Sequence, residues 1–332
     1  MFDTHPACCY IASKHRRDMY NPNKASIIIP TYKRPLLLRN LLNSLRTQTA
    51  MSRFEVIIAN DAEDEDHSDL EAEFSDISVK VVNLRGRHGR PVARNQAARL
   101  AEGDILIFLD DDMTVVPEFV EAHLKAHVHD RIAAAGDILT IPEYANDPLA
   151  RYIERQGARR HLGEASLPPR IFRTGNASVS RQFFLEAGMF DETVTTYGED
   201  LDLGMRLSYL GAEFVFVERA KSFHHYSPDL DDMLAKLEEW GRYTLPIHAK
   251  RHPDLARHLW LDLAVLPDRS SASFIRRLKH SLLWLALKPP FYKLARALFE
   301  LKFLGSLLFP VIDYLRVYTY LRAYRSAVEQ RQ

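Results

Sequence analysis

The chain has 332 residues, and its 44 Lys and Arg balance 44 Asp and Glu to a formal net charge of zero. This balance argues against nucleic acid as the main partner, because phosphate binding usually shows as an excess of basic residues. The composition is that of an ordinary folded protein, and the length allows one large core or two smaller ones.

The cysteines and the N-terminus indicate a compartment. Cys8 and Cys9 are the only cysteines, and they are too close in sequence for an ordinary structural disulfide and too few for a metal cage. This usage fits a reducing cytosol. The N-terminus lacks the apolar segment of a secretory signal, and no run approaches ~20 apolar residues, so we expect neither a signal peptide nor a transmembrane helix.

The first third of the chain alternates strand patterns with helix patterns. After a polar leader at residues 1–24, apolar runs predict strands at 25–29, 54–59, 79–82 and 105–109. Leu37, Leu41 and Leu45 recur at helical spacing after the first strand, and a second helix is predicted over about 91–101. Such alternation predicts an α/β fold with a mostly parallel central sheet and helices on both faces.

The rest of the chain is mainly helical. Pro117 suits the first turn of a helix that runs to about residue 129, and prolines punctuate a looser region after it. Further helices are predicted from Arg181 and from Gly198, and a last strand at 213–217. From residue 229 onward almost everything predicts helix.

Three consecutive carboxylates, Asp110, Asp111 and Asp112, follow the apolar strand 105–109. The carboxyl end of such a strand is where an open α/β sheet forms its ligand crevice. Adjacent acids repel one another, and a divalent cation with oxygen ligands would compensate this repulsion. The alternative is a solvated acidic turn.

Other polar clusters also follow strands or begin helices: Asp61, the pair Glu199-Asp200, and the pair His224-His225. Parallel topology gathers strand ends at one edge, so these clusters can converge on the acidic triplet. A carboxylate and an imidazole could then share a hard cation that keeps open positions for diphosphate oxygens. A histidine at a strand end can instead be simply hydrogen-bonded, and acids at a helix start are common caps.

Several short segments appear in a specific order: SIIIPTYKRP at 26–35, Asp61, Ala-Arg-Asn at 93–95, the acidic triplet, and YGEDLDL at 197–203 followed by Arg206. Together they resemble the successive signatures of family 2 inverting glycosyltransferases, over about residues 24–226. The resemblance implies a GT-A fold, with a catalytic domain at 25–228 and a helical region at 229–332.

The resemblance also implies roles in binding the donor. Pro30, Thr31 and Tyr32 would line the pocket for the nucleotide base, which Asp61 would contact. Arg94 would lie near the sugar-nucleotide.

The resemblance also implies that the acidic triplet and the histidine pair bind the diphosphate and its metal. Asp110 would lie near the ribose or the metal, Asp111 would belong to the donor-binding set, and Asp112 would be a direct metal ligand. His224 matches a further metal ligand of many family members, with His225 as the fallback. The expected cation is Mg²⁺ or Mn²⁺.

The resemblance implies that the pair Glu199-Asp200, at the start of the predicted helix, acts in catalysis. Asp200 matches the catalytic base, and Glu199 would help to hold the acceptor. Asp200 would deprotonate an acceptor hydroxyl as it attacks the anomeric carbon opposite the leaving group, which inverts the configuration.

The implied activity is metal-dependent transfer of a sugar from a nucleotide-diphospho-sugar, with uridine favoured as the base, to a hydroxyl acceptor in surface glycan or glycolipid synthesis. A nucleotidyltransferase with a similar sheet and acidic metal site is one alternative. A non-catalytic sugar-nucleotide-binding or membrane-scaffold protein is another.

Two loops have two interpretations each. The segment Gly86-Arg87-His88-Gly89-Arg90 could approach a phosphate, since Gly permits close contact and Arg supplies forked donors, or it could be a solvated turn. The segment 175–178 resembles the family segment below the donor sugar and beside the acceptor.

The C-terminal region is basic and aromatic. Residues 270–332 hold eleven Lys and Arg against three acids, an excess of 11 − 3 = +8. Basic amphipathic helices with Trp and Tyr can lie in a membrane interface, which would place the protein in the cytoplasm at the membrane face. A helical cap on the catalytic domain, or a dimer contact, is the alternative.

Overall fold

The computed structural model describes residues 21–161, 164, 167–194, 196–265 and 273–330. Cys8, Cys9 and most of the predicted leader lie outside these residues. Within the described residues, eight strands form one sheet. They are β1 (Ala25–Thr31), β2 (Phe54–Asn60), β3 (Val79–Asn83), β4 (Ile105–Leu109), β5 (Met113–Val115), β6 (Ile132–Thr140), β7 (Asn176–Ser180) and β8 (Glu213–His224).

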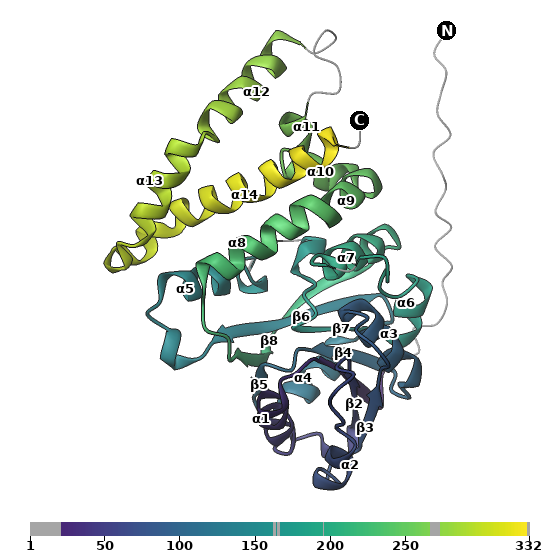
Figure 1. Ribbon diagram of the computed structural model, residues 1–332. Coiled ribbons are helices and arrows are strands. Elements are labelled where there is room, and N and C mark those ends of the chain that lie inside the picture. The colour runs from purple at the N-terminus through teal and green to yellow at the C-terminus, as the bar shows by residue number, and fades with distance from the viewer. Residues whose placement is uncertain (1–20, 162–163, 165–166, 195, 266–272, 331–332) are drawn as a thin grey trace, which may run out of the picture.

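The sheet is mixed, with the order β3-β2-β1-β4-β7-β6-β8-β5. Parallel pairs join β1 to β2 and β4, β2 to β3, and β6 to β8. Strand β7 runs antiparallel between β4 and β6, and β5 pairs antiparallel with β8 at the far edge. The carboxyl ends of β1, β2 and β4 therefore lie together at one edge of the sheet (Figure 1).

Helices and short helical turns connect and cover the strands. The α-helices are α1 (Pro35–Leu45), α2 (Asp69–Glu73), α3 (Arg90–Leu100), α4 (Phe119–Ala126), α5 (Pro148–Arg155), α6 (Arg181–Glu186), α7 (Glu199–Tyr209), α8 (Leu230–Glu239), α9 (Leu245–Arg251), α10 (Pro253–His258), α11 (Leu261–Ala264), α12 (Phe274–Ala286), α13 (Pro289–Phe299) and α14 (Phe309–Glu329). The shorter turns are η1 (Met51–Arg53), η2 (Pro142–Tyr144), η3 (Ala158–His161), η4 (Pro169–Ile171), the π-helical η5 (Trp240–Thr244) and η6 (Lys302–Leu308).

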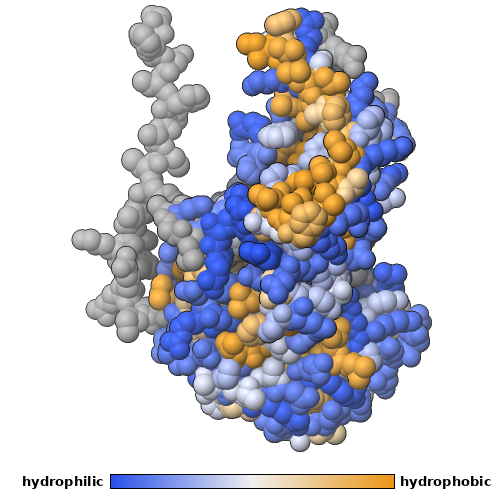
Figure 2. Space-filling model, turned by 90° about the vertical axis from the view of Figure 1, so that its left-hand side faces the viewer, coloured by the Kyte–Doolittle hydropathy of each residue, from blue (hydrophilic) through white to orange (hydrophobic). Residues whose placement is uncertain are grey.

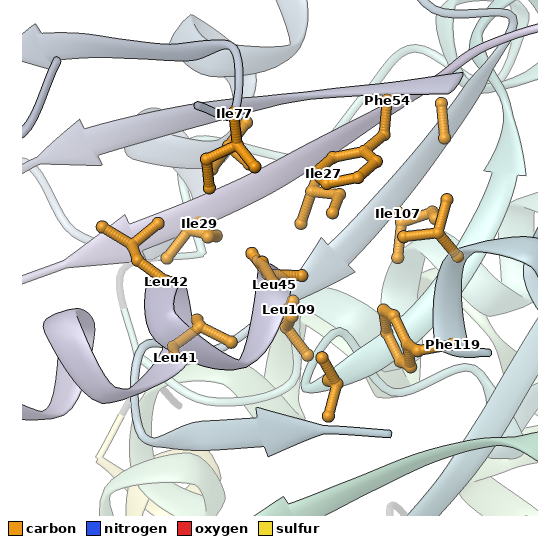
Figure 3. Packing of buried hydrophobic residues seen from close by; sticks show 14 of the residues in the cluster. Ile27, Ile29, Leu41, Leu42, Leu45, Phe54, Ile77, Ile107, Leu109 and Phe119 are labelled. Atoms are coloured by element: carbon orange, nitrogen blue, oxygen red, sulfur yellow. The ribbon is translucent and has the colours of Figure 1, made fainter. Parts of the chain in front are cut away.

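The sheet has an apolar core on each face, because successive side chains of a strand point to opposite sides. Ile27 and Ile29 of β1 pack with α1 and α4 on one face (Figure 3). Ile28, between them, belongs to the second core, which also holds side chains of α3, α6 and α7. The expected α/β sheet with helices on both faces is confirmed.

Three strands were not predicted. Two of them, β6 and β7, consist largely of small residues with weak strand propensity, IAAAGDILT and NASVS. Their small side chains suit a crowded position: a Cβ on Gly136 of β6 would lie 2.1 Å from the Asn176 Oδ1 atom of β7. The third, β5, has only three residues.

The last strand is longer than predicted. It was expected at 213–217, but β8 continues through the charged segment 218–221 to His224. His224 therefore ends a strand rather than following one, and β5 fixes its position.

The C-terminal helices form a second layer above the sheet (Figure 1). Ile312 and Leu315 of α14 pack into an apolar cluster with α5, α8 and α13. A second cluster joins the other end of α14, at Leu321, to α9, α11 and α12. Among the described residues, no helix combines the length and the apolar character needed to cross a bilayer.

Candidate active site

The acidic triplet begins where β4 ends, and a short reversal of the chain brings a histidine to it. After Asp112 the chain turns into β5, in which Met113 pairs with His224 of β8. The His224 Nε2 atom lies 3.4 Å from the Asp112 Oδ1 atom, and the backbone N–H of His225 donates to the Asp112 carbonyl at 2.8 Å. The His225 ring instead bonds the Thr114 hydroxyl at 2.9 Å, so His224 is the histidine beside the Asp112 carboxylate.

An arginine from the first loop bridges two of the acids. Arg34 donates from its Nη1 atom to Asp112 Oδ2 at 2.7 Å and to Asp111 Oδ1 at 3.3 Å, and the Thr31 hydroxyl donates to Asp111 Oδ2 at 2.7 Å. Burial would raise the pKa of Asp112, but His224 and Arg34 outweigh it and hold this pKa below its ordinary value. The sequence placed Arg34 in a family signature but did not indicate this ion pair.

A fully buried guanidinium connects the triplet to the predicted catalytic pair. Arg94 of α3 has no exposed surface, and it donates to Glu199 Oε1 and to Asp110 Oδ1, each at 2.8 Å. The Arg90 Nε atom lies 3.4 Å from the same Glu199 oxygen. Burial favours the neutral form of Glu199, yet Arg90 and Arg94 outweigh it and lower the pKa. Glu199 is therefore a buried, ionised group paired with the arginines of α3.

Asp200 lies one residue further along α7 in a different environment. Gly198, the residue before α7, has a φ of 103°, a conformation that glycine adopts readily. The Leu201 N–H donates to Asp200 Oδ1 at 2.7 Å. Burial and the negative charge of Glu199 raise the pKa of Asp200 to about 6, although Arg173 and Arg94 act in the opposite direction. A carboxylate with such a pKa is suited to accept a proton near neutral pH.

The Asp61 carboxylate organises the glycine-containing loop. It accepts the backbone N–H groups of His88 and Gly89, both at 2.8 Å. Arg87 of the same loop lies over the Tyr32 ring, 5.0 Å from its centroid. The loop is therefore held against the end of β2, with Arg87 at the rim of a pocket.

This pocket, of about 420 Å³, contains many of the predicted donor-site residues, namely Pro30, Thr31, Tyr32, Asp61, Asp110, Asp111, Asp112 and His224. A second cavity of about 510 Å³ contains Glu199 and Asp200. Arg90, Asp110, Tyr197, His224 and Lys236 line both. Arg94 lies behind the two cavities and lines neither. The structure thus places the acidic triplet beside the helix start that carries Asp200.

Other residues of the second cavity were not singled out in the sequence. They come from η4, the segment before β7, α8, η5 and α14, and include Arg170, Arg173, Lys236, Trp240 and Arg316. No local pattern indicates them, because Lys236, Trp240 and Arg316 reach the cavity only through the packing of the C-terminal helices, and Arg170 and Arg173 come from an irregular segment. The segment at 175–178 does meet the site: a Cβ on Gly175 would lie 3.2 Å from the Asp110 Oδ2 atom.

The donor set at Asp112 fits a hard divalent cation. The Asp112 Oδ1 atom is buried and accepts no hydrogen bond from any residue that the structure describes, while the His224 imidazole lies beside it. Carboxylate and imidazole are ordinary ligands of Mn²⁺. No group of three or more His, Cys, Asp or Glu side chains in the described part of the chain could hold a metal ion by itself, so substrate oxygens would have to complete the coordination.

Comparisons with known proteins agree with this arrangement. The family model described as glycosyl transferase family 2 matches residues 26–186. The uncharacterized glycosyltransferase YfnE of Bacillus subtilis is 30% identical over 269 residues, with 64% of this chain and 69% of that protein covered. The O-antigen biosynthesis protein RfbC of Myxococcus xanthus is 29% identical over 242 residues; the match covers 67% of this chain and 19% of RfbC.

A solved structure shares the fold. The mannosyltransferase PcManGT of Pyrobaculum calidifontis, determined with GDP-Man and Mn²⁺, superposes with a TM-score of 0.54 at 15% identity and covers 90% of this chain and 87% of that one. Such low identity supports the GT-A fold alone. The match to YfnE and the match to the family model show the family, and the fold and the convergent acidic site agree with them. This chain is a glycosyltransferase and belongs to glycosyl transferase family 2.

Proposed function

We propose that the chain is a metal-dependent inverting glycosyltransferase that transfers a sugar from a nucleotide-diphospho-sugar, with UDP as the favoured nucleotide, to a hydroxyl of a glycan or glycolipid. The observation that carries the proposal is the junction of the two cavities. The pocket with the acidic triplet and the cavity that holds Asp200 share Asp110 and Tyr197 among their lining residues, so the two lie side by side. A donor in the first cavity would present its anomeric carbon to an acceptor in the second.

The proposed donor site divides into a base end and a diphosphate end. Pro30, Thr31 and Tyr32 would line the base, and Asp61 would act by holding the 86–90 loop as well as by facing the base. Arg87 would reach the donor from that loop. Among the acids, Asp110 and Asp111 would complete the donor-binding set.

Asp112, with His224 and Asp110, would hold Mg²⁺ or Mn²⁺ at the diphosphate end. The bound cation would supply electrostatic stabilisation of the charge that develops on the leaving nucleoside diphosphate. Arg34, already paired with Asp112 and Asp111, adds a fixed positive charge to the same region.

Asp200 would act as the general base. Its carboxylate would take the proton of the acceptor hydroxyl while the hydroxyl oxygen forms the new bond to the anomeric carbon and the bond to the nucleoside diphosphate breaks. Glu199 was expected to hold the acceptor. Its Oε1 atom is engaged by Arg94, so its contribution would be to keep α3 and α7, and with them Asp200, in place.

The alternatives predict different results at Asp200. A nucleotidyltransferase would cleave between phosphates and has no need for a base in the second cavity. A non-catalytic sugar-nucleotide-binding or scaffold protein would not depend on the ionisation of Asp200 at all. The raised pKa of this residue and its position in a second cavity next to the acidic triplet favour sugar transfer over both.

The test is a panel of UDP- and GDP-sugars with the full chain, with and without Mn²⁺. Thermal stabilisation measures binding, and released nucleoside diphosphate measures slow transfer to water. We expect one donor to stabilise the chain only with the metal, and Asp112→Ala to abolish that response. Asp130→Ala, which changes an exposed carboxylate away from both cavities, is the matched control. No response to any donor would contradict the proposal.

We also propose that α12, α13 and η6 contact a membrane at its cytoplasmic face. Figure 2 shows an apolar stripe on the upper part of the molecule, on the side where α12 and α13 lie in Figure 1. Phe274, Phe303 and Leu307 are 71%, 83% and 73% exposed. Basic side chains are also exposed here, such as Lys288 between α12 and α13 and Lys293 of α13. Exposed aromatic and aliphatic groups flanked by Lys and Arg suit a surface of anionic lipids.

Vesicle sedimentation tests this contact. The full chain should sediment with vesicles that contain anionic phosphatidylglycerol and less with neutral phosphatidylcholine vesicles. The double substitution Phe303→Ser and Leu307→Ser should release it, whereas Leu36→Ser, at an exposed leucine of α1, should not. Equal recovery in the supernatant with both vesicle types, or a dimer that the double substitution separates, would assign the stripe to another role.

A further inference from the structure

The cavity in front of Asp200 is basic, in contrast to the donor pocket. The described residues that line it include five Lys or Arg and three Asp or Glu, whereas those of the donor pocket include four basic and five acidic side chains. Two of the three acids in the basic cavity, Asp110 and Glu199, are paired with Arg94 from behind. The surplus positive charge therefore belongs to the outer part of the cavity.

Three guanidinium groups carry this charge. Arg170 comes from η4, Arg173 from the segment between η4 and β7, and Arg316 from α14. Within the described part of the chain, the side chains of Arg170 and Arg173 form no hydrogen bond or ion pair, and burial lowers the pKa of both. Arg316 donates to the Tyr152 hydroxyl and lies 3.7 Å from Asp313.

Unpaired cations in a partly enclosed cavity are unfavourable unless an anion joins them. Asp200 alone does not balance them, because it is one carboxylate among three guanidinium groups and the other two acids of the cavity are paired with Arg94. A substrate that brings a negative charge would remove the imbalance. Guanidinium groups suit phosphate and carboxylate, because their planar fork matches two oxygens of either group.

We propose that the acceptor carries a phosphate or carboxylate group near its reactive hydroxyl, and that Arg170, Arg173 and Arg316 bind this group so that the hydroxyl faces Asp200. The inference depends on the proposed function, since it names the class of acceptor for the same site. Arg173 is near enough to act on the charge of Asp200, which places the anion and the reacting hydroxyl on neighbouring parts of one acceptor. Arg170, at the exposed rim, would admit a longer anionic chain.

The test measures binding to the full chain saturated with the nucleoside diphosphate of the donor that the panel identifies. Glycerol 1-phosphate and glucuronate are compared with glycerol and glucose by isothermal titration at constant ionic strength. The phosphate and carboxylate arms show which anion the cavity prefers. We expect at least one anion to bind about tenfold or more tightly than its neutral counterpart, because a hydrogen bond to a charged group contributes at least about a factor of ten.

Two variants test the assigned arginines. Arg170→Gln, at the exposed rim, should weaken anion binding about tenfold and leave nucleotide binding unchanged, and adding Arg316→Gln should weaken it further. Arg257→Gln, which removes an exposed cation of α10 that pairs with Asp254, should have no effect. If Arg316→Gln does not fold, the single Arg170 variant still decides the matter.

The outcomes separate this inference from the proposed function. Anions that bind no better than their neutral counterparts, or that bind the Arg170 variant as tightly as the wild type, would overturn the inference while leaving sugar transfer intact. Failure of every nucleotide-sugar to bind would instead contradict the proposed function.

Discussion

Substitution of Asp200 by Asn should increase stability while removing activity. Asn has nearly the same shape and can keep the hydrogen bond that Asp200 Oδ1 accepts from the Leu201 N–H at 2.7 Å. It removes only the negative charge, which burial and Glu199 make unfavourable. The substitution therefore distinguishes the effect of the Asp200 charge on the free energy of unfolding from its effect on catalysis.

The size of the stability gain follows from the pKa of Asp200, which is raised from an ordinary 3.8 to about 6. Between these values the folded protein holds a proton that the unfolded chain has released, so the wild type loses stability as the pH rises through this range. Above pH 6 the loss is complete. A difference of about two pH units corresponds to ~3 kcal/mol, which is the gain expected for Asp200→Asn at pH 8 and which should vanish near pH 3.5.

Activity should change in the opposite direction. With the donor and metal that the panel identifies, the wild-type kcat/KM should fall about tenfold per pH unit below pH 6, because only ionised Asp200 can accept the proton. Asp200→Asn should lower kcat by about 10²–10⁴-fold at pH 8, where wild-type Asp200 is ionised, and by less below pH 6, and it should leave donor binding unchanged.

The assays are urea denaturation at pH 8 and pH 4 and initial rates between pH 5 and pH 8. Asp130→Asn, at an exposed position, serves as the control for an Asp-to-Asn change and should alter neither property. An Asp200→Asn variant that is no more stable than wild type at pH 8 would refute the argument from burial, and one that retains wild-type turnover would refute the role of base.

Three further substitutions test the framework of the site. Arg94→Met should lower the free energy of unfolding by ~3–5 kcal/mol, because it removes the hydrogen-bonded partner of both Glu199 and Asp110 and leaves only Arg90, at 3.4 Å, beside the buried Glu199 carboxylate. A loss below 1 kcal/mol in urea denaturation at pH 7 would contradict this. Gly198→Ala should cost ~1–3 kcal/mol in thermal unfolding, since φ is 103° and the new Cβ would lie 2.7 Å from the Trp240 Nε1 atom; an unchanged Tm would count against so close a contact with Trp240. Asn176→Ala should cost ~3 kcal/mol or more, because its side chain forms three buried hydrogen bonds, and Asn176→Gln should not restore the loss in the same denaturation assay.

Much of the donor pocket could be predicted from the sequence, because its residues directly follow uninterrupted apolar strands. The runs at β1, β2 and β4 are buried on both faces and read as strands without ambiguity. Asp61 and the acidic triplet come immediately after two of them, and parallel pairing puts strand ends at one edge. The convergence of these residues therefore follows from local pattern and one rule of topology.

The middle of the sheet could not be predicted, because β6 and β7 lack the side chains that mark a strand. Their alanines, glycine and serines are selected by the space between neighbours, as the closeness of Gly136 to Asn176 shows. Periodicity and propensity describe a residue's relation to solvent and to its own backbone. They carry no information about how closely two remote strands approach.

The sequence by itself determined that β1, β2 and β4 form and which acids follow β2 and β4, because a strand buried on both faces must be apolar and its polar continuation must leave the sheet. Only the tertiary structure decided that Arg94 joins Asp110 to Glu199, that β5 turns His224 toward Asp112, and that α14 brings Arg316 over the cavity of Asp200. These contacts link residues far apart along the chain. Their geometry depends on how whole elements pack, which no local pattern of residues specifies.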